Sequence, residues 1–321
     1  MRAAFHEKPG PPDVLQVGEL PDPKPGARDV LIRVRASSLD RVDIYYREGS
    51  HGVTRCPLCP PHVGGRDIAG EVVAIGAEVD TFPVGARVVS SSFHAHAELA
   101  VAPAALTFPL PPNCSFAEGG AIPTAGRTAF AALMNQARIK AGEDVLIFAA
   151  GSGVGSFAIQ IARAAGCRVI ATAGSADKLE RARDLGAECA INHYTEDVAV
   201  RVAEVTNGRG VDVVIDHVGT PVWKAAMLSL APWGRFVTAG VTAGHRVDLH
   251  LGQVFVKGTQ IMGVGRPDEA EMAEAMAGLL RLIKRRQVRP VVHVTFPLEA
   301  IAEAHRLMER SDFFGKIVLT V

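Results

Sequence analysis

The clearest pattern of hydrophobic and polar positions lies between Asp144 and Ala173. The continuous apolar run Val145–Ala150 has the length of a strand buried on both faces. Glycines follow it, and the mostly apolar stretch 154–165 is typical of a buried helix that ends at Gly166. Val169–Ala173 then predicts the next strand. This order of strand, glycine turn, helix and strand predicts a βαβ unit that binds a dinucleotide.

The alternation of strand and helix patterns continues and predicts an α/β fold, a doubly wound parallel sheet of the Rossmann type. Its six expected strands are Val145–Ala150, Val169–Ala173, Cys189–Asn192, Val211–Asp216, Arg235–Gly240 and Thr259–Val264. The expected helices are 121–137, 154–165, 177–185, 196–206 and 221–231.

Residues 1–120 instead show short alternating strands separated by Pro and Gly, a pattern typical of an irregular β domain or partial barrel. The clearest strands are Val30–Ser37, Glu71–Ile75, Arg87–Ser90 and Glu98–Val101. Beyond the sheet we expect helix Glu269–Arg286, strand Val291–Phe296, helix 297–310 and a closing strand Phe314–Val321 that rejoins the first domain. The expected domain bounds are therefore 1–122 and 267–321 for the β domain and 123–266 for the dinucleotide-binding domain.

The composition is that of a globular protein: 321 residues, 48% hydrophobic and 21% charged. Acidic and basic residues are equal in number, so nothing points to nucleic acid or an anionic membrane as a partner. We find neither the apolar core of a signal peptide nor a run of transmembrane length. Five cysteines, an odd number, favour a reducing compartment, and we expect a cytoplasmic location.

Four residues of the glycine turn, Ser152, Gly153, Val154 and Gly155, are expected to bind the dinucleotide phosphates. The fingerprint is imperfect: one frame ends at Ser156, and the other has Ala150 and Ser152 in place of its first two glycines. An ordinary tight turn is the alternative. Its place between a buried strand and a helix favours the dinucleotide.

The end of the second strand indicates which dinucleotide. An NAD site carries an acidic residue there to accept the ribose 2′-OH, but the chain reads Thr172-Ala173-Gly174-Ser175. Ser175 and Lys178 suit a 2′-phosphate, so we expect NADP(H). A solvated helix-face lysine is the alternative, and Asp177 is close enough to weaken the inference.

Several motifs together resemble the medium-chain dehydrogenase/reductase superfamily, in particular its zinc-free quinone oxidoreductase branch and the neighbouring alcohol dehydrogenase-like proteins. The motifs are GGRDIAGEVVAIGAEVDTFPVGARV (64–88), AIPTAGRTAF (121–130), AGEDVLIFAAGSGVGSFAIQIARAAG (141–166), DVVIDHVG (212–219) and FGKIVL (314–319). The resemblance spans essentially the whole chain. It implies a GroES-like catalytic domain built from both chain ends, a central Rossmann domain and hydride transfer in the cleft between them.

The resemblance also addresses zinc. Zinc-dependent members hold the metal with a Cys in the segment matching Ser37–Asp43, a His in Gly-His-Glu and a later Cys or Asp. Here that segment has no Cys, the motif reads Gly65-Arg66-Asp67, and 119–128 has neither Cys nor Asp. We therefore expect a zinc-independent protein and assign no metal ligands.

One feature departs from the family. Cys56, Cys59 and His62, with His51 nearby, have metal-like spacing, but no second pair is present. A packed proline-rich loop is the favoured interpretation, with a metal site or a CxxC redox pair as alternatives. His94 and His96 would share one face if they lay on a strand; we expect them to be exposed or satisfied histidines rather than ligands.

A site without a Lewis acid is poorly equipped to oxidise a simple alcohol. Reduction of a quinone or of an alkene conjugated to a carbonyl depends less on a Lewis acid, because the acceptor takes the arriving charge on its own oxygen. By resemblance, Asp40 (where zinc-free relatives often have Asn) and Tyr45 line the acceptor pocket. Thr128 lies where relatives contact the nicotinamide. For Tyr45 the alternative is simple packing.

The remaining expected cofactor contacts lie at strand ends or follow from the resemblance. Either His193 or Tyr194 matches a tyrosine that relatives place near the adenosine. Lys316 matches a residue near the phosphates, with a surface lysine as the alternative, and Asp216 has a turn cap as its alternative. The residues at strand ends are Asp216, Val218, Gly240, Val241, Gly263 and Val264.

These patterns favour an NADPH-dependent, zinc-free quinone or enone reductase. A metal-dependent alcohol dehydrogenase with ligands relocated to Cys56, Cys59 and His62 is one rival, and an NADPH-binding protein with little turnover is another. Relatives pair sheet edges, so a homodimer or homotetramer joined at the apolar segment Thr259–Val264 is expected.

Overall fold

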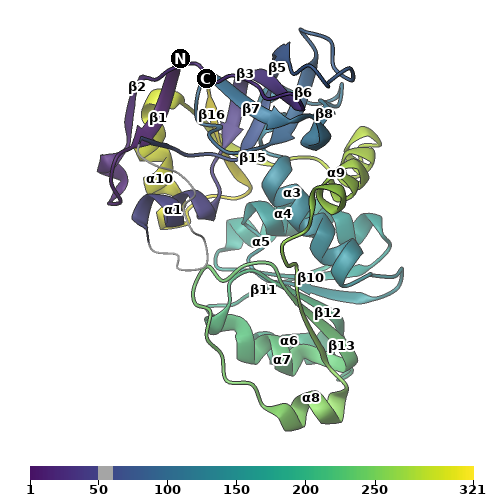
Figure 1. Ribbon diagram of the computed structural model, residues 1–321. Helices are drawn as coiled ribbons and strands as arrows, with labels where there is room; N and C mark the ends of the chain where they lie inside the picture. Colours follow the sequence, from purple (N-terminus) through teal and green to yellow (C-terminus); the bar gives the residue numbers. More distant parts are fainter. Residues whose placement is uncertain (50–60) are drawn as a thin grey trace. The chain divides into compact units, whose positions relative to one another are not determined.

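The computed structural model describes residues 1–49 and 61–321, which form two compact units (Figure 1). Unit 1 comprises residues 1–125, 269–277 and 290–321, and unit 2 comprises residues 126–268 and 278–289. Both chain ends therefore belong to unit 1. Among the described helices, none is long and apolar enough to cross a membrane.

Unit 2 is built on a six-stranded parallel sheet with the strand order β11-β10-β9-β12-β13-β14. Its strands are β9 (Asp144–Ile147), β10 (Arg168–Ala173), β11 (Cys189–Asn192), β12 (Val211–Asp216), β13 (Leu230–Thr238) and β14 (Gln260–Gly263). The order confirms the predicted doubly wound sheet, because the chain runs outward from β9 in one direction and then returns to β12 on its other side.

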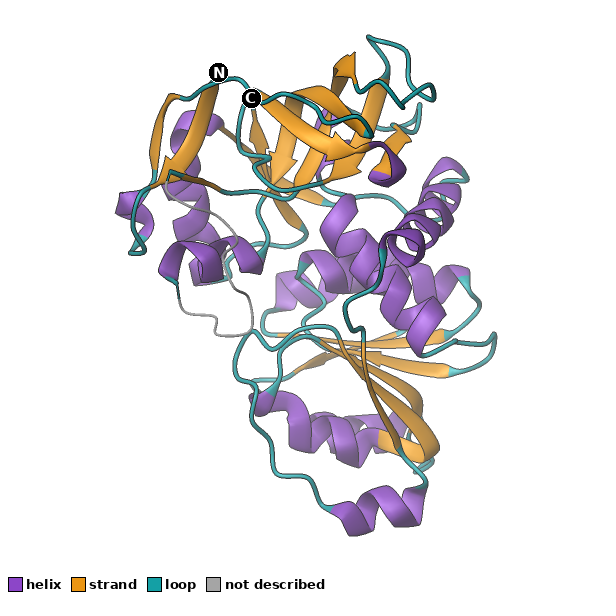
Figure 2. Cartoon of the chain, viewed as in Figure 1, coloured by secondary structure: helices purple, strands orange, loops and turns teal. Residues whose placement is uncertain are grey.

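Helices cover both faces of this sheet, α4 and α5 on one and α6 and α7 on the other (Figure 2). The helices are α3 (Pro123–Phe130), continued by a π-helical turn (Ala131–Gln136), α4 (Gly153–Ala164), α5 (Ala176–Leu185), α6 (Val198–Val205), α7 (Trp223–Ser229) and α8 (Leu251–Lys257). All of β9 is buried, and Leu146, Ile170 and Val214 of adjacent strands pack in one core cluster. Burial on both faces explains the continuous apolar runs of the sequence.

Unit 1 holds a seven-stranded sheet, β15-β16-β3-β5-β6-β8 with β7 paired to β3, and a three-stranded sheet, β2-β1-β4. The strands are β1 (Arg2–His6), β2 (Gln16–Glu19), β3 (Asp29–Ser38), β4 (His62–Val63), β5 (Asp67–Ile75), β6 (Arg87–Ser91), β7 (Leu99–Pro103), β8 (Thr107–Pro109), β15 (Val292–Pro297) and β16 (Lys316–Thr320). Its helices are α1 (Arg41–Glu48), α2 (Phe116–Gly120) and α10 (Ile301–Arg310), while the chain of α9 (Glu269–Lys284) is shared between the units.

The closing strand returns to the N-terminal part as predicted: β16 pairs antiparallel with β3, with Val318 opposite Ser38. The same strand pairs in parallel with β15. As a consequence, Lys316 at the start of β16 is held next to the end of β3 and the beginning of α1.

Local features differ from the sequence expectations at several points. α1 and α8 lie in segments for which the sequence analysis names no helix, and the first helical residue of α10 is Ile301 rather than Pro297. His94 and His96 do not share a strand: they lie in the loop between β6 and β7, and His94 has a φ of 62°. Only His96 is fully buried.

Candidate functional site

The glycine turn of unit 2 is closely packed at the start of α4. Ser152 caps the helix, and its Oγ accepts the Gly155 N–H at 2.8 Å. A Cβ at Gly155 would lie 2.3 Å from the carbonyl oxygen of Ala149, so only glycine fits there. The unpaired N–H groups of the helix N-terminus and the close backbone turn suit a pyrophosphate.

Four predicted residues gather where β10 and β11 end. Ser175 caps α5 by accepting the Lys178 backbone N–H at 3.4 Å, and the rings of His193 and Tyr194 lie 4.5 Å apart. Gly174 has no room for a Cβ, which would meet the Tyr194 side chain at 2.3 Å. Burial, and secondly the charge of Lys178, lower the pKa of His193. A basic group, a hydroxyl and two rings therefore share one edge of the sheet.

A third group of predicted residues follows β12, β13 and β14. Asp216 caps the turn after β12, because its Oδ1 accepts the Val218 N–H at 2.7 Å and the Gly219 N–H at 3.2 Å. Burial raises the pKa of Asp216 to about 6. Gly240 and Val241 follow β13, Gly263 ends β14, and the Val264 N–H is bonded to Thr238 O at 3.0 Å. Thr128 is half-buried on α3.

In unit 1 one ammonium group joins two carboxyl groups, one fully buried on Asp67 and one on Asp40, whose side chain is 13% exposed. Lys316 Nζ lies 2.5 Å from Asp40 Oδ1 and 3.2 Å from Asp67 Oδ2. Asp67 also accepts the Ser38 hydroxyl at 2.7 Å and the Thr124 N–H at 2.8 Å. The alternative interpretation of Lys316 as a surface lysine is therefore excluded, since its side chain is 3% exposed.

The pKa values of the two carboxyl groups shift in opposite directions. Burial, and secondly the charge of Asp67, raise the pKa of Asp40 to about 8. Although burial opposes it, the ammonium of Lys316 lowers the pKa of Asp67. The extra donors on Asp67 explain the difference, because Asp40 Oδ2 is buried without a hydrogen-bond partner among the described residues. The cluster holds its proton on Asp40 at neutral pH.

Asp43 adds a third carboxyl group to this region. Its Oδ2 accepts the Asp40 N–H at 2.8 Å and its Oδ1 accepts the Gly65 N–H at 3.0 Å. Tyr45, two residues further along α1, is half-buried. The sequence analysis missed Asp43 and the role of Asp67. The only signal for Asp67 was its place in Gly65-Arg66-Asp67.

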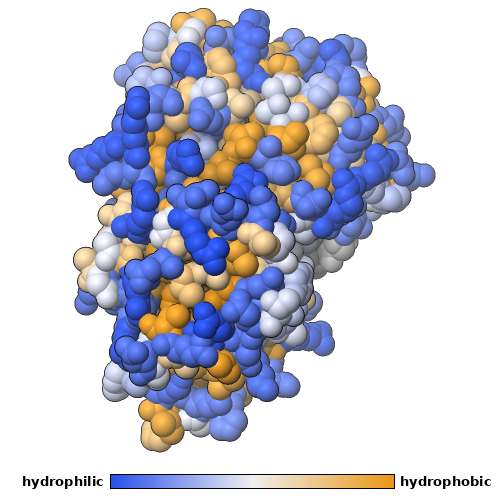
Figure 3. Space-filling view, turned by 180° about the vertical axis from the view of Figure 1, so that it is seen from behind, coloured by the Kyte–Doolittle hydropathy of each residue, from blue (hydrophilic) through white to orange (hydrophobic). Residues whose placement is uncertain are grey.

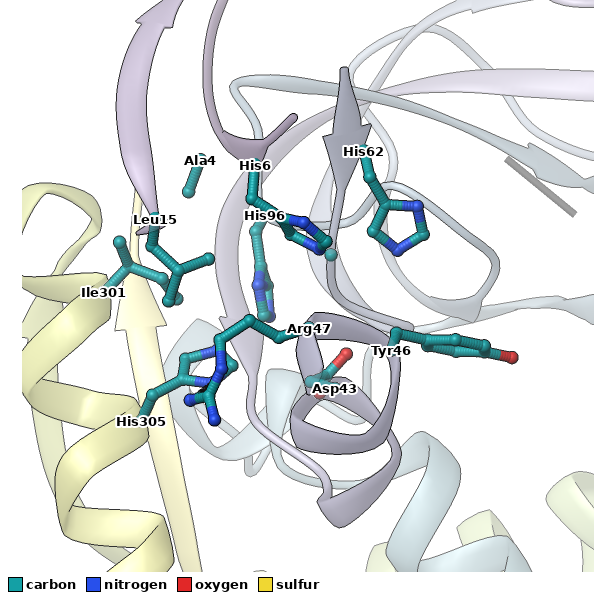
Figure 4. Close-up of a pocket in the computed structure, with 11 residues that line it drawn as sticks. Ala4, His6, Leu15, Asp43, Tyr46, Arg47, His62, His96, Ile301 and His305 are labelled. Atoms are coloured by element: carbon teal, nitrogen blue, oxygen red, sulfur yellow. Dashed lines mark hydrogen bonds between the residues drawn. The ribbon is translucent and has the colours of Figure 1, made fainter. Parts of the chain in front are cut away.

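A small pocket in unit 1 is lined by four histidines around Arg47 (Figure 4). Arg47 is buried; it donates to Gly10 O at 2.9 Å and to the carboxylate of Glu309 at 2.5 Å, and it lies 3.3 Å from His305 Nδ1. Burial lowers the pKa of His62 and of His96 to about 4, so these rings are neutral. The remaining lining histidine is His6. No pattern in the sequence indicated this cluster.

The question of a metal rests partly on the undescribed segment. Within residues 1–49 and 61–321, no three His, Cys, Asp or Glu residues are grouped so as to hold a metal ion. Cys56, Cys59 and His51 lie outside the described residues, so the metal and redox interpretations of that loop stay predictions. His62 packs with its ring centroid 4.8 Å from that of His6 and 5.7 Å from that of Tyr46.

Comparison with known proteins matches both parts of the chain. The alcohol dehydrogenase GroES-like domain matches residues 26–112, and the zinc-binding dehydrogenase domain matches residues 153–282. A quinone oxidoreductase of Pseudomonas aeruginosa is 35% identical over 97% of this chain and 96% of its own, and that of Rattus norvegicus is 32% identical over 99% and 97%.

Solved structures give the same result. An NAD-dependent alcohol dehydrogenase superposes with a TM-score of 0.92 at 36% identity, covering all of both chains. The Escherichia coli quinone oxidoreductase complexed with NADPH has a TM-score of 0.88 at 28% identity, again over all of both chains. The chain belongs to the medium-chain dehydrogenase/reductase superfamily. Within it, the protein is an oxidoreductase of the quinone oxidoreductase kind.

Proposed function

We propose that the protein transfers hydride from NADPH to a quinone or an α,β-unsaturated carbonyl compound without a metal ion. The main observation in support is that Lys316 bonds both Asp40, at 2.5 Å, and Asp67, at 3.2 Å. These residues stand in the two segments that hold zinc in zinc-dependent members. Because Lys316 already bonds both carboxyl groups and balances the charge of Asp67, the arrangement supports chemistry that needs no Lewis acid. An acceptor that spreads the arriving charge onto its own oxygen fits this site.

NADPH is favoured over NADH by residues of unit 2 and by a relative. The sequence Thr172-Ala173-Gly174-Ser175 at the end of β10 offers no carboxylate for a ribose 2′-OH, and Lys178 follows at the start of α5. The E. coli relative was solved with NADPH. We assign the phosphates to the turn 152–155, the 2′-phosphate to Ser175 and Lys178, and the adenosine to His193 and Tyr194. Bound NADPH would supply the hydride.

The remaining cofactor contacts are proposed at the ends of the later strands. They are Asp216, through its turn, and Val218, Gly240, Val241, Gly263 and Val264, with Thr128 on α3 facing the nicotinamide. Lys316 is not among them, because its ammonium group is buried and already bonded to Asp40 and Asp67.

On the acceptor side, Asp40 supplies the proton that accompanies the hydride. Its Oδ1 accepts from Lys316, which leaves Oδ2, buried and without a partner among the described residues, as the oxygen that carries the proton. Transfer of this proton to the acceptor oxygen completes a two-electron reduction, and the carboxylate left behind is stabilised by Lys316. Tyr45 donates a hydrogen bond to the same acceptor oxygen, and solvent returns the proton to Asp40.

We also propose a homodimer joined through the edge of the unit 2 sheet. β14 is the last strand of that sheet, and large apolar side chains are exposed on it and on α8, the helix before it in the chain: Ile261 by 41%, Leu251 by 72%, Phe255 by 85% and Val256 by 81%. Hydrophobic residues are visible at the lower end of Figure 3, where α8 lies. An exposed apolar patch of this kind is typical of an interface.

A metal-dependent alcohol dehydrogenase is the second candidate, because a structure with that activity in its name is 36% identical to this chain. This candidate needs ligands from Cys56, Cys59 and His62.

The deciding test is NADPH oxidation against a benzoquinone, a naphthoquinone, an enal and an aldehyde, each with and without a strong chelator. Turnover of quinone or enal that is insensitive to chelator, with NADPH preferred over NADH, supports the proposal. Aldehyde reduction that the chelator abolishes would favour the metal-dependent candidate. Binding of NADPH with negligible turnover of every acceptor would favour a binding protein.

A further inference from the structure

The imidazole of His217 has one nitrogen without a partner at the end of β12. The residue is 8% exposed, and its Nε2 lies 2.7 Å from Ser152 Oγ. Its Nδ1 is buried, and no group of the described residues forms a hydrogen bond with it. A buried polar atom without a partner is rare in a folded protein and calls for an explanation.

The hydrogen bonds of Ser152 define which proton His217 carries. Ser152 Oγ already accepts the Gly155 N–H at 2.8 Å as the cap of α4, so its own hydrogen is available for His217 Nε2. Burial lowers the pKa of His217 to about 4, so the ring is neutral. A neutral imidazole that accepts at Nε2 carries its hydrogen on Nδ1. The opposite tautomer would leave both the serine hydrogen and Nδ1 without partners.

His217 lies where a sheet of this kind binds its ligand, so a ligand could accept a hydrogen bond from its Nδ1–H group. Ser152 follows β9 and His217 follows β12, and these neighbouring strands flank the point where the strand order reverses. In sheets of this kind, ligands bind outside the carboxyl ends of the strands at that point. The backbone is fixed there, since Thr242 donates from N at 3.3 Å and from Oγ1 at 3.0 Å to His217 O. The absence of a side chain at Gly240 leaves room for the His217 side chain, because a Cβ at position 240 would lie 3.2 Å from His217 Cβ.

We propose that His217 is a further cofactor-binding residue, whose Nδ1–H donates a hydrogen bond to a ribose or pyrophosphate oxygen of the dinucleotide while Ser152 holds the ring in the required tautomer. This inference rests on the proposed function, because it requires that unit 2 binds a dinucleotide. It adds to the glycine turn a donor from the opposite side of the switch point. It also accounts for the unpartnered nitrogen, which gains its acceptor only on binding.

Two variants distinguish the role of Nδ1 from the role of Nε2. His217→Gln keeps an amide near the position of Nε2 and so keeps the bond to Ser152, but it removes the donor at Nδ1. His217→Asn keeps an amide N–H near the position of Nδ1 and removes the bond to Ser152. Titration of the full chain with NADPH, followed by nicotinamide fluorescence, should show a dissociation constant about tenfold higher for His217→Gln and within about threefold of wild type for His217→Asn.

Thermal unfolding of the ligand-free variants provides a readout that turnover does not affect. His217→Gln should unfold at or above the wild-type temperature, because it removes a buried donor that had no acceptor. Unchanged NADPH affinity of His217→Gln, or an equal loss in both variants, would overturn the role of His217 alone. Failure of the wild-type chain to bind NADPH or NADH would instead overturn the proposed function.

The wild-type protein gives an independent check should a variant fail to fold. Imidazole nitrogen NMR should show the His217 proton on Nδ1, and its Nδ1 resonance should shift when NADPH is added. A proton on Nε2, or a resonance that NADPH does not move, would overturn the inference.

Discussion

Lys316 and Asp40 lie 276 residues apart in the chain, and their side chains meet at 2.5 Å. The pairing of β16 with β3 brings them together, because Lys316 begins the former and Asp40 follows the latter. One ammonium group then faces Asp40 and Asp67, with Asp43 close by. Burial, and secondly this excess of carboxyl groups over ammonium, is why one proton stays bound, and the lack of other donors on Asp40 is why it stays there.

The first prediction concerns the pH dependence of activity. Because Asp40 has a pKa of about 8, kcat/KM should fall as the pH rises through that value and the carboxyl group loses its proton. In Asp40→Asn this fall should disappear, and the rate below it should drop by about 100-fold, since an amide donates a hydrogen bond but no proton. Initial rates with a quinone over a pH series measure both. Asp80→Asn, at an exposed position, is the control; an Asp40→Asn profile like the wild type would contradict the role.

The same pKa predicts a pH dependence of stability. Folding raises the pKa of Asp40 from 3.8 to about 8, so the folded state binds more protons than the unfolded state between these values. The contribution of Asp40 to the free energy of unfolding is therefore fully present below the lower value and is lost as the pH rises to the upper one. The melting temperature of Asp40→Asn relative to wild type should thus increase from about pH 5 to about pH 9. A difference that stays constant over this range would contradict the assignment.

Removal of the ammonium group tests its structural role. Lys316→Met leaves Asp67 and Asp40 buried without their cation, and breaking a buried ion pair in this way costs about 3–5 kcal/mol of unfolding free energy. Denaturant titration followed by circular dichroism measures the loss. Lys140→Met, at an exposed lysine, should change the unfolding free energy by less than about 0.5 kcal/mol. Equal effects of the two substitutions would show that the cluster contributes nothing to stability.

The sequence predicts the sheet of unit 2 well, because periodicity and glycine placement are local signals. The carboxyl ends of β10 to β14 each lie within two residues of the end of the expected strand. β9 ends earlier than expected, because the backbone turns after Ile147 into the glycine segment. α8 was missed because most of its apolar side chains face solvent and give no helical periodicity against a core.

In the candidate site, too, local features could be predicted from the sequence and long-range contacts could not. The caps at Ser152 and Ser175 and the close turn at Gly155 could be predicted, because caps and glycine turns are set by residues close together in sequence. The cofactor contacts assigned to these residues stay predictions. The bonds of Lys316 to Asp40 and of Ser152 to His217 could not be predicted, because each depends on strand order. His217 lies within the motif DVVIDHVG (212–219), but the motif by itself indicates no contact for its imidazole. Its importance follows only from an unpartnered nitrogen, which no sequence pattern records.

Cofactor choice can be tested at Lys178. Lys178→Glu replaces a cation near the expected 2′-phosphate with an anion, so the KM for NADPH should rise by about 10- to 100-fold, the equivalent of a charge-assisted hydrogen bond. The KM for NADH, which lacks that phosphate, should change little. Steady-state rates with both cofactors and one quinone measure the difference. Lys224→Glu on α7 is the matched control; a parallel rise in both constants for Lys178→Glu would contradict the 2′-phosphate assignment.

The oligomeric state can be tested at α8. Phe255 is 85% exposed on that helix, which directly precedes the edge strand β14 in the chain, and burial of such a side chain is the main driving force for association. Light scattering of the wild type should give twice the 33.9 kDa mass of one chain, or a higher multiple. Phe255→Lys should shift the mass toward one chain, because a lysine placed in an apolar interface loses its hydration. Val200→Lys changes an apolar residue that is 53% exposed on α6 and should leave the mass unchanged. A wild-type mass of one chain would show that the exposed apolar side chains of β14 and α8 do not join two copies.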